Sequence, residues 1–271
     1  MTIRTLILLS ASVVLLSACT TPALRTALPA DATGVKSLLW VGNNFFYYNN
    51  SMHDHLGKLM TSSGAKGLRA SSATISGSSL KWHDVEAYLR PDGLGSVSID
   101  VRDEVRFPTY DKLFDGVMMM DCSLCPVLPN LQPLFHKYIA KHSATARKFG
   151  AAPILFMAWS ERRLPDTTAQ IAAEYIKAGK RNNALVVPAA LAFANAITQR
   201  PELDLYDPGG RYPSLMGTYL GACMVAASVY KTNPIGLSYT AGLPDDVAAF
   251  LQRVAWDTSQ AFHAKEGLDT F

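Results

Sequence analysis

The residues of this chain that could carry out chemistry fall in three short stretches. The first is the turn Gly42-Asn43-Asn44, which ends an apolar run and precedes an aromatic cluster in LLWVGNNFFYYNN, residues 38–50. This pattern is typical of a buried parallel strand that stops at a sharp turn and leads into a helix. In open α/β sheets the functional crevice lies at the carboxyl ends of the strands. We therefore expect a site at this turn, with the Asn44 amide in it.

The second stretch, residues 76–83, supplies serine hydroxyls after one predicted strand, and Ser123 follows the end of another. An imidazole can activate a serine hydroxyl for attack on an ester, so ester hydrolysis is one function that the sequence keeps open. His83 or His55 would be the base, although we expect His53 and His55, in the first turn of a predicted helix, to be solvated. The candidate nucleophiles are Ser76, Ser78, Ser79 and Ser123.

The third stretch is the CxxC pair Cys122 and Cys125. We expect a local disulfide here; a redox function is the alternative, but Pro126 and Pro129 disfavour the helix that follows reactive CxxC pairs. A zinc site would need two more ligands, and none stands at a suitable spacing. The sequence therefore predicts neither a metal nor a cofactor. Cys223, in an apolar helix, is expected to be a buried small hydrophobic residue.

The elements that must position these residues alternate between strands and helices. Strands are predicted at 35–42, 67–75, the end of 110–120, 152–158 and 184–187, with a short strand or an irregular insert at 97–101. Helices are predicted at 51–62, 131–149, 167–177 (with a capping box of Thr167 and Gln170), 189–199, 214–230 and 245–263. This alternation predicts a mostly parallel sheet with helices on both faces, a three-layer α/β/α sandwich of the flavodoxin-like kind.

The amino terminus reads as a targeting segment. Arg4 precedes an apolar run at 6–16 that is too short to span a bilayer comfortably, and small residues follow. Leu16-Ser17-Ala18-Cys19 resembles the lipobox of bacterial lipoproteins, which implies cleavage before Cys19 and a lipid on its thiol. Thr20 after it resembles the outer-membrane sorting pattern. We expect a lipoprotein of the bacterial cell envelope, anchored in the outer membrane and facing the periplasm.

Size and charge limit the remaining possibilities. We assign 1–18 to a signal peptide, the polar 19–34 to a tether and 35–271 to a single domain, because removing 18 of the 271 residues leaves 253, enough for one large α/β domain. Hydrophobic residues make up 49% of the chain and charged residues 17%, which fits a well-buried core. The net charge is only +3 and no block of Lys or Arg stands out, so nucleic acid is not an expected partner.

Four patches, in order, resemble the sequence blocks of SGNH (GDSL-like) hydrolases. LLWVGNNFFYYNN is similar to the first block, ISGSSLKWH to the second and FDGVMMMDCS to the strand before the third. LYDPGGRYPSLMGTYLGACMVAASVY is similar to the last block, where the family carries an Asp, two spacers, a His and then Pro-Ser before an apolar helix. Together the patches cover roughly residues 37 to 240. The resemblance implies the SGNH-hydrolase fold over the whole domain.

The catalytic triad that the resemblance implies is replaced at every position. The nucleophilic serine corresponds to Asn44, the histidine to Tyr212 and the aspartate to Gly209. An amide nitrogen is not a usable nucleophile at neutral pH, a phenol with a pKa near 10 is a poor general base, and glycine has no side chain to orient one. Loss of single triad members costs hydrolases orders of magnitude in rate.

Other features of the family's site have counterparts here. Gly77 matches the glycine of the second block that helps bind the oxyanion, so an anion or a carbonyl group could still be held at this turn. Asn43 precedes the nucleophile position and is expected to set the geometry of the turn. Asp207 lies two residues before the expected acid, in an Asp-Pro turn. Met120 and Asp121 stand where relatives often show Gln-Glu.

These residues allow three functions. The first is a lipid-anchored SGNH-like protein without serine esterase activity, which binds a glycan, an acyl group or a protein of the cell envelope in the cleft of the fold. Asn44, Tyr212, Trp82 and Trp159 would line that cleft. The second is an ester hydrolase with a different nucleophile and base. The third is a periplasmic thiol protein that uses Cys122 and Cys125.

Overall fold

The computed structural model describes residues 34–91, 93–94, 98–99, 105–106 and 112–270. The expected signal peptide, the tether and the lipidation residue Cys19 lie outside the described residues. So does most of the segment 97–101, of which only Ser98–Ile99 (β3) is described, paired antiparallel with Val105–Arg106 (β4).

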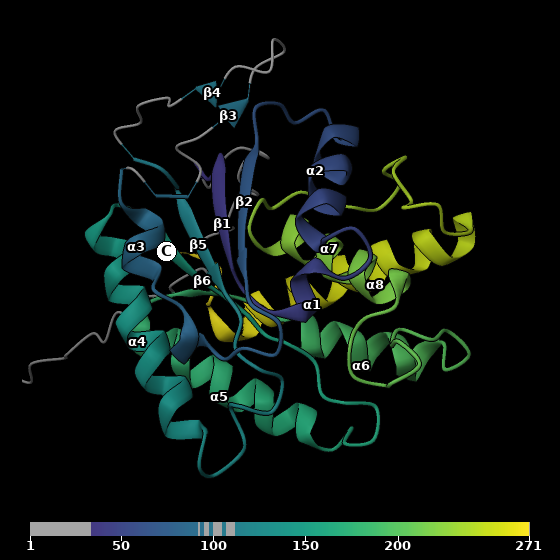
Figure 1. Ribbon diagram of the computed structural model, residues 1–271. Coiled ribbons are helices and arrows are strands. Elements are labelled where there is room, and N and C mark those ends of the chain that lie inside the picture. Colours follow the sequence, from purple (N-terminus) through teal and green to yellow (C-terminus); the bar gives the residue numbers. More distant parts are fainter. Residues whose placement is uncertain (1–33, 92, 95–97, 100–104, 107–111, 271) are drawn as a thin grey trace, which may run out of the picture.

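A five-stranded parallel sheet forms the centre of the molecule, with the strand order β2-β1-β5-β6-β7 (Figure 1). Its strands are Ser37–Gly42 (β1), Arg69–Thr74 (β2), Gly116–Met119 (β5), Ala152–Phe156 (β6) and Leu185–Val187 (β7). β1 is buried at all six residues because it lies between β2 and β5, with Leu38 opposite Ala70 on one side and Gly116 on the other. The α/β sandwich with a parallel sheet is thus confirmed.

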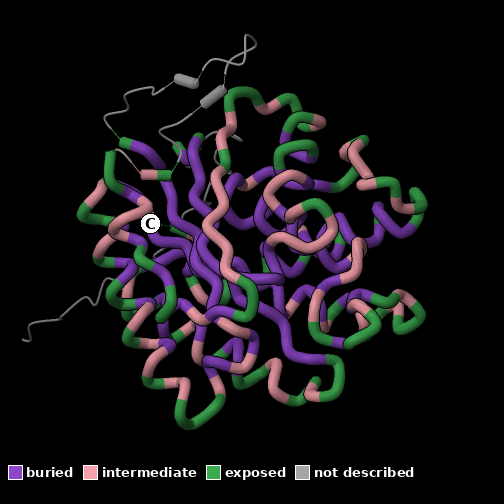
Figure 2. Tube along the Cα trace, viewed as in Figure 1, coloured by how far each residue is buried: buried purple, intermediate pink, exposed green. Residues whose placement is uncertain are grey.

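Helices cover both faces of the sheet. Met52–Ser62 (α2), Leu215–Ser228 (α7) and Asp245–Glu266 (α8) pack together, and Val85–Leu89 (α3), Gln132–Lys148 (α4) and Thr167–Asn182 (α5) form a second group (Figure 1). Ala189–Gln199 (α6) packs against α5, α7 and α8. Strands β1, β5, β6 and β7 are buried almost throughout and the edge strand β2 is half-buried, while the outer faces of the helices are largely exposed (Figure 2). None of the described helices has both the length and the apolar character that crossing a membrane requires.

The predicted helix at 167–177 differs from the structure at both ends. The capping box is wrong, because Asp166 precedes the first helical residue and the Thr167 hydroxyl donates to the Leu164 carbonyl at 2.8 Å. The helix also continues to Asn182, and in this last part Gly179 packs directly on β7: a Cβ there would lie 2.6 Å from Val186 Cγ2. Asn183 ends it in the left-handed region, with φ 45°.

Three short helical segments were not predicted. They are Asn44–Tyr47 (α1), the 3₁₀ turn Leu80–Trp82 and α3. Each has five residues or fewer, too short for an apolar periodicity to develop. α1 matters most for the candidate site. The sharp turn predicted after β1 is the start of this helix, and Asn43 is its N-cap.

The residues at the start of α7, Pro213–Gly217, fix how this helix meets the loop before it. The Ser214 hydroxyl accepts a hydrogen bond from the Gly217 amide at 3.3 Å, and the Ser214 amide donates to the Leu205 carbonyl at 3.0 Å. Helix α7 is pressed so closely on this loop that a Cβ at Gly217 would lie 2.3 Å from the Leu205 carbonyl oxygen. A glycine at this position therefore lets the loop and the helix meet.

We expect Gly217→Ala to lower the free energy of unfolding by about 2 kcal/mol, because the added methyl group forces backbone apart in a packed core. Gly57→Ala is the matched control: Gly57 is an exposed glycine inside α2, and no atom lies within 4 Å of the position that its added methyl group would take. It should raise the free energy of unfolding by about 0.5–1 kcal/mol. Urea unfolding followed by circular dichroism measures both, and equal stabilities of the two variants would contradict close packing at Gly217.

Candidate functional site

The turn after β1 is built by the side chain of Asn43. Its Oδ1 accepts a hydrogen bond from the Phe45 amide at 3.3 Å, which caps α1, and its Nδ2 donates to the Ser78 carbonyl at 2.9 Å. Asn43 is 2% exposed, so both bonds form out of solvent. The residue thus sets the turn geometry, as the sequence predicts, and it also ties the end of β1 to the loop that follows β2.

The Asn44 side chain is fully occupied by neighbouring groups. Its Oδ1 accepts a hydrogen bond from the Gly77 amide at 2.6 Å, and its Nδ2 donates to the Tyr47 hydroxyl at 2.7 Å and to Ser76 Oγ at 3.1 Å. Gly77 presents its N–H from a left-handed conformation, with φ 67°. The N–H that corresponds to the family's oxyanion donor is therefore bound to the chain's own carboxamide.

Asp207 organises the loop that carries the other two triad-equivalent positions. Its Oδ1 accepts from the amides of Arg211 and Tyr212, each at 3.1 Å, and its own amide donates to the Tyr212 carbonyl at 2.8 Å. Gly209 lies within this turn, where a Cβ would be 3.2 Å from Asp207 Oδ2. The carboxylate thus holds the backbone of the turn, as expected for an Asp-Pro turn.

Tyr212 closes the site from the opposite side. Its ring packs against Phe45, with centroids 5.4 Å apart, and against Tyr48 at 4.8 Å, while the Arg211 guanidinium lies over its outer side at 5.5 Å. Asn44 and Tyr212 line one narrow hollow, together with Asn43, Phe45, Gly77, Ser78, Cys122 and Arg211. The hollow has no room for a water molecule.

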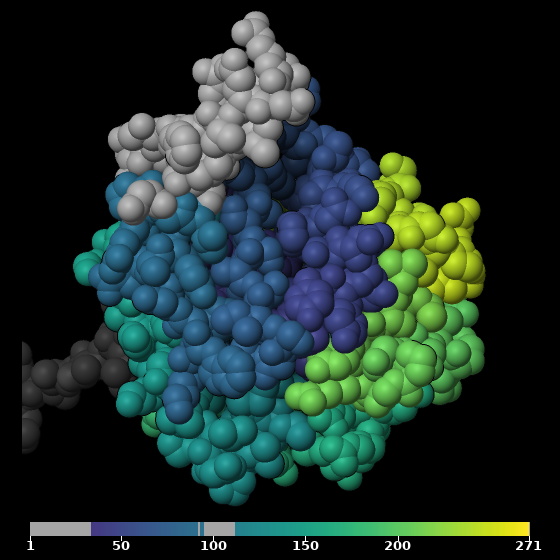
Figure 3. All heavy atoms as spheres, in the orientation of Figure 1, coloured from purple at the N-terminus to yellow at the C-terminus, as the bar shows by residue number. Residues whose placement is uncertain are grey.

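The surface around this hollow is assembled from distant parts of the chain. In Figure 3 the purple segment after β1 lies beside blue segments of the region near residue 80 and light-green segments of the region near residue 210. Arg211 is exposed, and Tyr47, Tyr48 and Tyr212 are half-buried. Tyr47, Tyr48 and Arg211 were not predicted as site residues; only the aromatic cluster FFYY marked the first two.

The two tryptophans expected to line a cleft do not do so together. Trp159 is 1% exposed and stacks on Phe193, with ring centroids 3.8 Å apart and an interplanar angle of 8°. Its Nε1 donates to the Arg211 carbonyl at 3.2 Å, so it supports the loop from within the core. Trp82 is 62% exposed on the surface. The expectation for Trp159 is therefore wrong.

One serine lies within hydrogen-bond distance of a histidine. Ser78 Oγ is 3.1 Å from His83 Nε2 and 3.2 Å from the Gly42 carbonyl oxygen, and Tyr88 Oη is 3.4 Å from His83 Nδ1. Burial lowers the pKa of His83 to about 4, so the ring is neutral at pH 7. Ser78 has no exposed surface, however, and a phenol takes the place of the carboxylate that would stabilise an imidazolium.

The remaining serine and histidine candidates are occupied or separated. Both ring nitrogens of His55 are engaged, Nδ1 with the Tyr239 hydroxyl at 2.7 Å and Nε2 with the Asn49 carbonyl at 2.6 Å. His55 is 4% exposed, so the expectation that it is solvated is wrong. Ser79 is half-buried, and Ser123 is buried with its hydroxyl unpaired.

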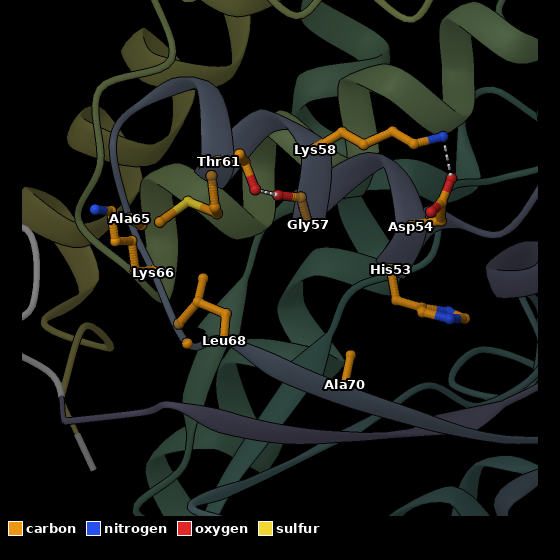
Figure 4. Close-up of a pocket in the computed structure, with 11 residues that line it drawn as sticks. His53, Asp54, Gly57, Lys58, Thr61, Ala65, Lys66, Leu68 and Ala70 are labelled. Atoms are coloured by element: carbon orange, nitrogen blue, oxygen red, sulfur yellow. Dashed lines mark hydrogen bonds and ion pairs between the residues drawn. The ribbon is translucent and has the colours of Figure 1, made fainter. Parts of the chain in front are cut away.

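A separate cavity of about 540 Å³ lies between α2 and the edge strand β2. His53 points from α2 toward the strands, and Lys58 bridges to Asp54 at 2.8 Å along the rim (Figure 4). Burial lowers the pKa of His53. This groove is open to solvent, and it holds none of the candidate site residues predicted from the sequence.

Cys122 and Cys125 form a disulfide immediately after β5. Asp121, which precedes it, is 2% exposed, and its Oδ1 accepts hydrogen bonds from the amides of Leu80 at 3.1 Å and Cys122 at 2.8 Å. Burial raises the pKa of Asp121 to about 6, although these two hydrogen bonds act in the opposite direction. Cys223 is buried with a free thiol.

Solved structures described as SGNH or GDSL-like hydrolases match the chain. A proposed SGNH hydrolase from Slackia heliotrinireducens is 22% identical, covers 70% of this chain and 96% of its own, and superposes with a TM-score of 0.53. A DUF4886 family protein from Bacteroides uniformis is 16% identical, with 82% and 93% covered and a TM-score of 0.57. A GDSL-like lipase from Parabacteroides merdae is 12% identical, with 72% and 95% covered and a TM-score of 0.52.

The chain therefore has the fold of SGNH (GDSL-like) hydrolases. No protein-family model and no curated protein sequence matches it.

We expect Asn44→Ala to lower the free energy of unfolding by about 1–3 kcal/mol, because it removes the bond to the Gly77 N–H together with the other hydrogen bonds of a side chain that belongs to a buried residue. Ser76→Ala is the matched control, since it removes one hydrogen bond to Asn44 and leaves the Gly77 contact in place. Its cost should stay near 0.5–1 kcal/mol. Equal costs in urea unfolding would show that the Gly77 contact adds nothing to stability.

Proposed function

We propose that this protein is a non-hydrolytic member of the SGNH-fold proteins, lipid-anchored in the bacterial cell envelope, which binds an envelope glycan on the closed site. The observation that carries the first part is the hydrogen bond from the Gly77 amide to Asn44 Oδ1 at 2.6 Å. At the turn where a hydrolase needs a nucleophile, this chain has the Asn44 carboxamide. Its oxygen accepts the hydrogen bond of the Gly77 N–H, the group that would otherwise bind an oxyanion.

Ester hydrolysis in this hollow lacks each of its chemical requirements. A nucleophile, a base and an orienting carboxylate are needed together, and Asn44, Tyr212 and Gly209 provide none of them. Asp207 does not replace the missing acid, because its Oδ1 already holds two backbone amides of the loop. A substrate carbonyl would also have to displace Asn44 before it could reach the Gly77 N–H.

The aromatic surface at the mouth favours a glycan over an acyl group. Tyr47, Tyr48 and Tyr212 present partly exposed rings beside the Arg211 guanidinium. Tyrosine combines an apolar ring face, on which a sugar ring can stack, with a polar hydroxyl for hydrogen bonding. An acyl chain instead needs an apolar cavity, and the hollow has no room for a water molecule.

The anchor and the location rest on the sequence. The apolar segment that ends in Leu16-Ser17-Ala18-Cys19 supports lipid attachment at Cys19, and Thr20 supports the outer membrane. The polar stretch after it supports a tether on the periplasmic side.

A second function, ester hydrolysis by Ser78 and His83, is favoured by one observation, their separation of 3.1 Å. That distance is within the reach of a nucleophile and its base. The burial of Ser78 counts against it, because a substrate would need the loop after β2 to open.

For the wild-type protein we expect no hydrolysis of p-nitrophenyl acetate above the rate of the Asn44→Ala variant, and no labelling by a fluorophosphonate. The triple variant Asn44→Ser/Gly209→Asp/Tyr212→His should gain activity of at least about tenfold over wild type, because single triad members are worth orders of magnitude and positions 44 and 212 line one hollow.

The same assay separates the two functions. Turnover by wild type that disappears in Ser78→Ala would overturn the non-hydrolytic proposal and support the Ser78–His83 pair. The stability of Ser78→Ala, measured by urea unfolding, distinguishes loss of a nucleophile from loss of the fold.

For glycan binding, we expect the protein to co-sediment with purified peptidoglycan, and Tyr212→Ala to weaken binding about tenfold, the scale of one lost aromatic contact. Tyr212→Phe keeps the ring and should bind like wild type. Tyr138→Ala, a half-buried tyrosine on α4 outside the hollow, is the control. Unchanged binding by Tyr212→Ala would place any glycan site elsewhere.

A further inference from the structure

The disulfide Cys122–Cys125 has two unlike ends. Cys122 is half-buried and lines the narrow hollow beside Asn44 and Tyr212, whereas Cys125 is 3% exposed. The turn between them is closed by a hydrogen bond from the Cys125 amide to the Cys122 carbonyl at 3.1 Å. Of the two cysteines, Cys122 is therefore the residue with surface open to an external thiol, and attack on its sulfur would release the sulfur of Cys125.

A buried carboxyl group stands next to both sulfurs. An oxygen of Asp121 and the Sγ atoms of Cys122 and Cys125 all lie within 4.8 Å of one another. Asp121 and Cys125 also border a second hollow, between the loop after β2 and α4, which has room for about one water molecule. A proton can thus pass between the carboxyl group, the Cys125 sulfur and solvent over one short path.

The structural duties of Asp121 do not require an acid. Its Oδ1 accepts hydrogen bonds from the amides of Leu80 and Cys122, and an asparagine could accept both. Burying an ionisable group has a free-energy cost that a neutral amide avoids. The feature that only the acid provides is an exchangeable proton, and burial moves its pKa to about 6, where it titrates near neutral pH.

We propose that Cys122–Cys125 is a redox-active disulfide that exchanges with external thiols, with Cys122 as the sulfur attacked and Asp121 as the proton donor to Cys125. The co-reactant is a small thiol or a protein dithiol. This activity is independent of glycan binding and of the missing triad.

In the first step a thiolate attacks the Cys122 sulfur, the Cys122–Cys125 bond breaks, and its electron pair remains on the Cys125 sulfur. That sulfur takes the proton of Asp121, which is replaced from solvent through the hollow. In the second step another thiolate attacks the outer sulfur of the mixed disulfide and releases the Cys122 thiolate, which is protonated from solvent. Two external thiols become one disulfide, and their two electrons and two protons end on Cys122 and Cys125.

Other groups around Asp121 bear on the pH dependence of this exchange. Lys81 from the 3₁₀ turn and Tyr138 from α4 line the same hollow. Tyr175 of α5 also lies near Asp121. Burial is the main cause that raises the pKa of the Tyr175 hydroxyl, and the negative charge of Asp121 raises it further. The pKa of Tyr175 is thus held far above its ordinary value, so this hydroxyl stays neutral while the Asp121 carboxyl changes state near pH 6.

The test is reduction of the folded, full-length protein by dithiothreitol, with thiols counted by maleimide alkylation and mass spectrometry. We expect two new thiols in native buffer at about 1 mM dithiothreitol, without urea. Asp121→Asn should slow reduction about tenfold near pH 6 and little above pH 8, where wild-type Asp121 is also deprotonated. Ser123→Ala, an adjacent buried hydroxyl without a partner, should react like wild type.

A second measurement identifies the sulfur attacked. With oxidised glutathione, Cys125→Ser should form a mixed disulfide at Cys122 about tenfold faster than Cys122→Ser forms one at Cys125. Reduction of wild type only after urea unfolding would show that the disulfide is structural and would overturn the proposal. Equal pH profiles for wild type and Asp121→Asn, at equal stability, would remove Asp121 from it.

Discussion

The contact between Asn44 and Gly77 joins the ends of two neighbouring strands at the place where the fold positions its chemistry. β1 and β2 run parallel, so both carboxyl ends arrive at the same edge, and each turns sharply away from the sheet. The Asn44 carboxamide after β1 accepts a hydrogen bond from the Gly77 amide after β2, and the Asn43 side chain donates a second one to the Ser78 carbonyl. With both asparagines engaged, the two turns form one rigid unit, and the rest of the site is arranged against it.

On the other side of the hollow, aromatic residues also contact one another and the loop rather than leaving an open space. Tyr212 rests on Phe45 and Tyr48, and Trp159 supports the Arg211 carbonyl from below. Asp207 fixes the backbone between them. The Trp159 N–H and Asp207 Oδ1 are thus engaged by groups of the protein itself. These contacts within the protein contribute to the stability of the fold.

The sequence predicted the layers of this fold because buried strands and amphipathic helices leave local patterns. The runs at 35–42 and 152–158, and the helix at 189–199, needed no information beyond their own residues. The resemblance in four ordered patches then brought Asn44 and Tyr212 to one place, although 168 positions (212 − 44) separate them in the chain.

The features that the sequence did not predict depend on contacts between distant residues. His55 lies in a helical first turn that looks solvated, and its burial is set by Tyr239, 184 residues away. Trp159 follows a strand that reaches the site, yet its ring turns inward because Phe193 offers a parallel face for stacking. The direction of a side chain at a strand end is decided by such partners, which no local pattern records.

The direction of β1 has a consequence for orientation. The chain enters the sheet at Ser37 and reaches the hollow six residues later, at the far end of the strand, roughly 20 Å away at the usual rise per residue. With a lipid on Cys19, as proposed, the membrane would hold the molecule by its amino-terminal edge. The surface around Tyr47, Tyr48 and Tyr212 would then face away from the bilayer, toward the periplasm.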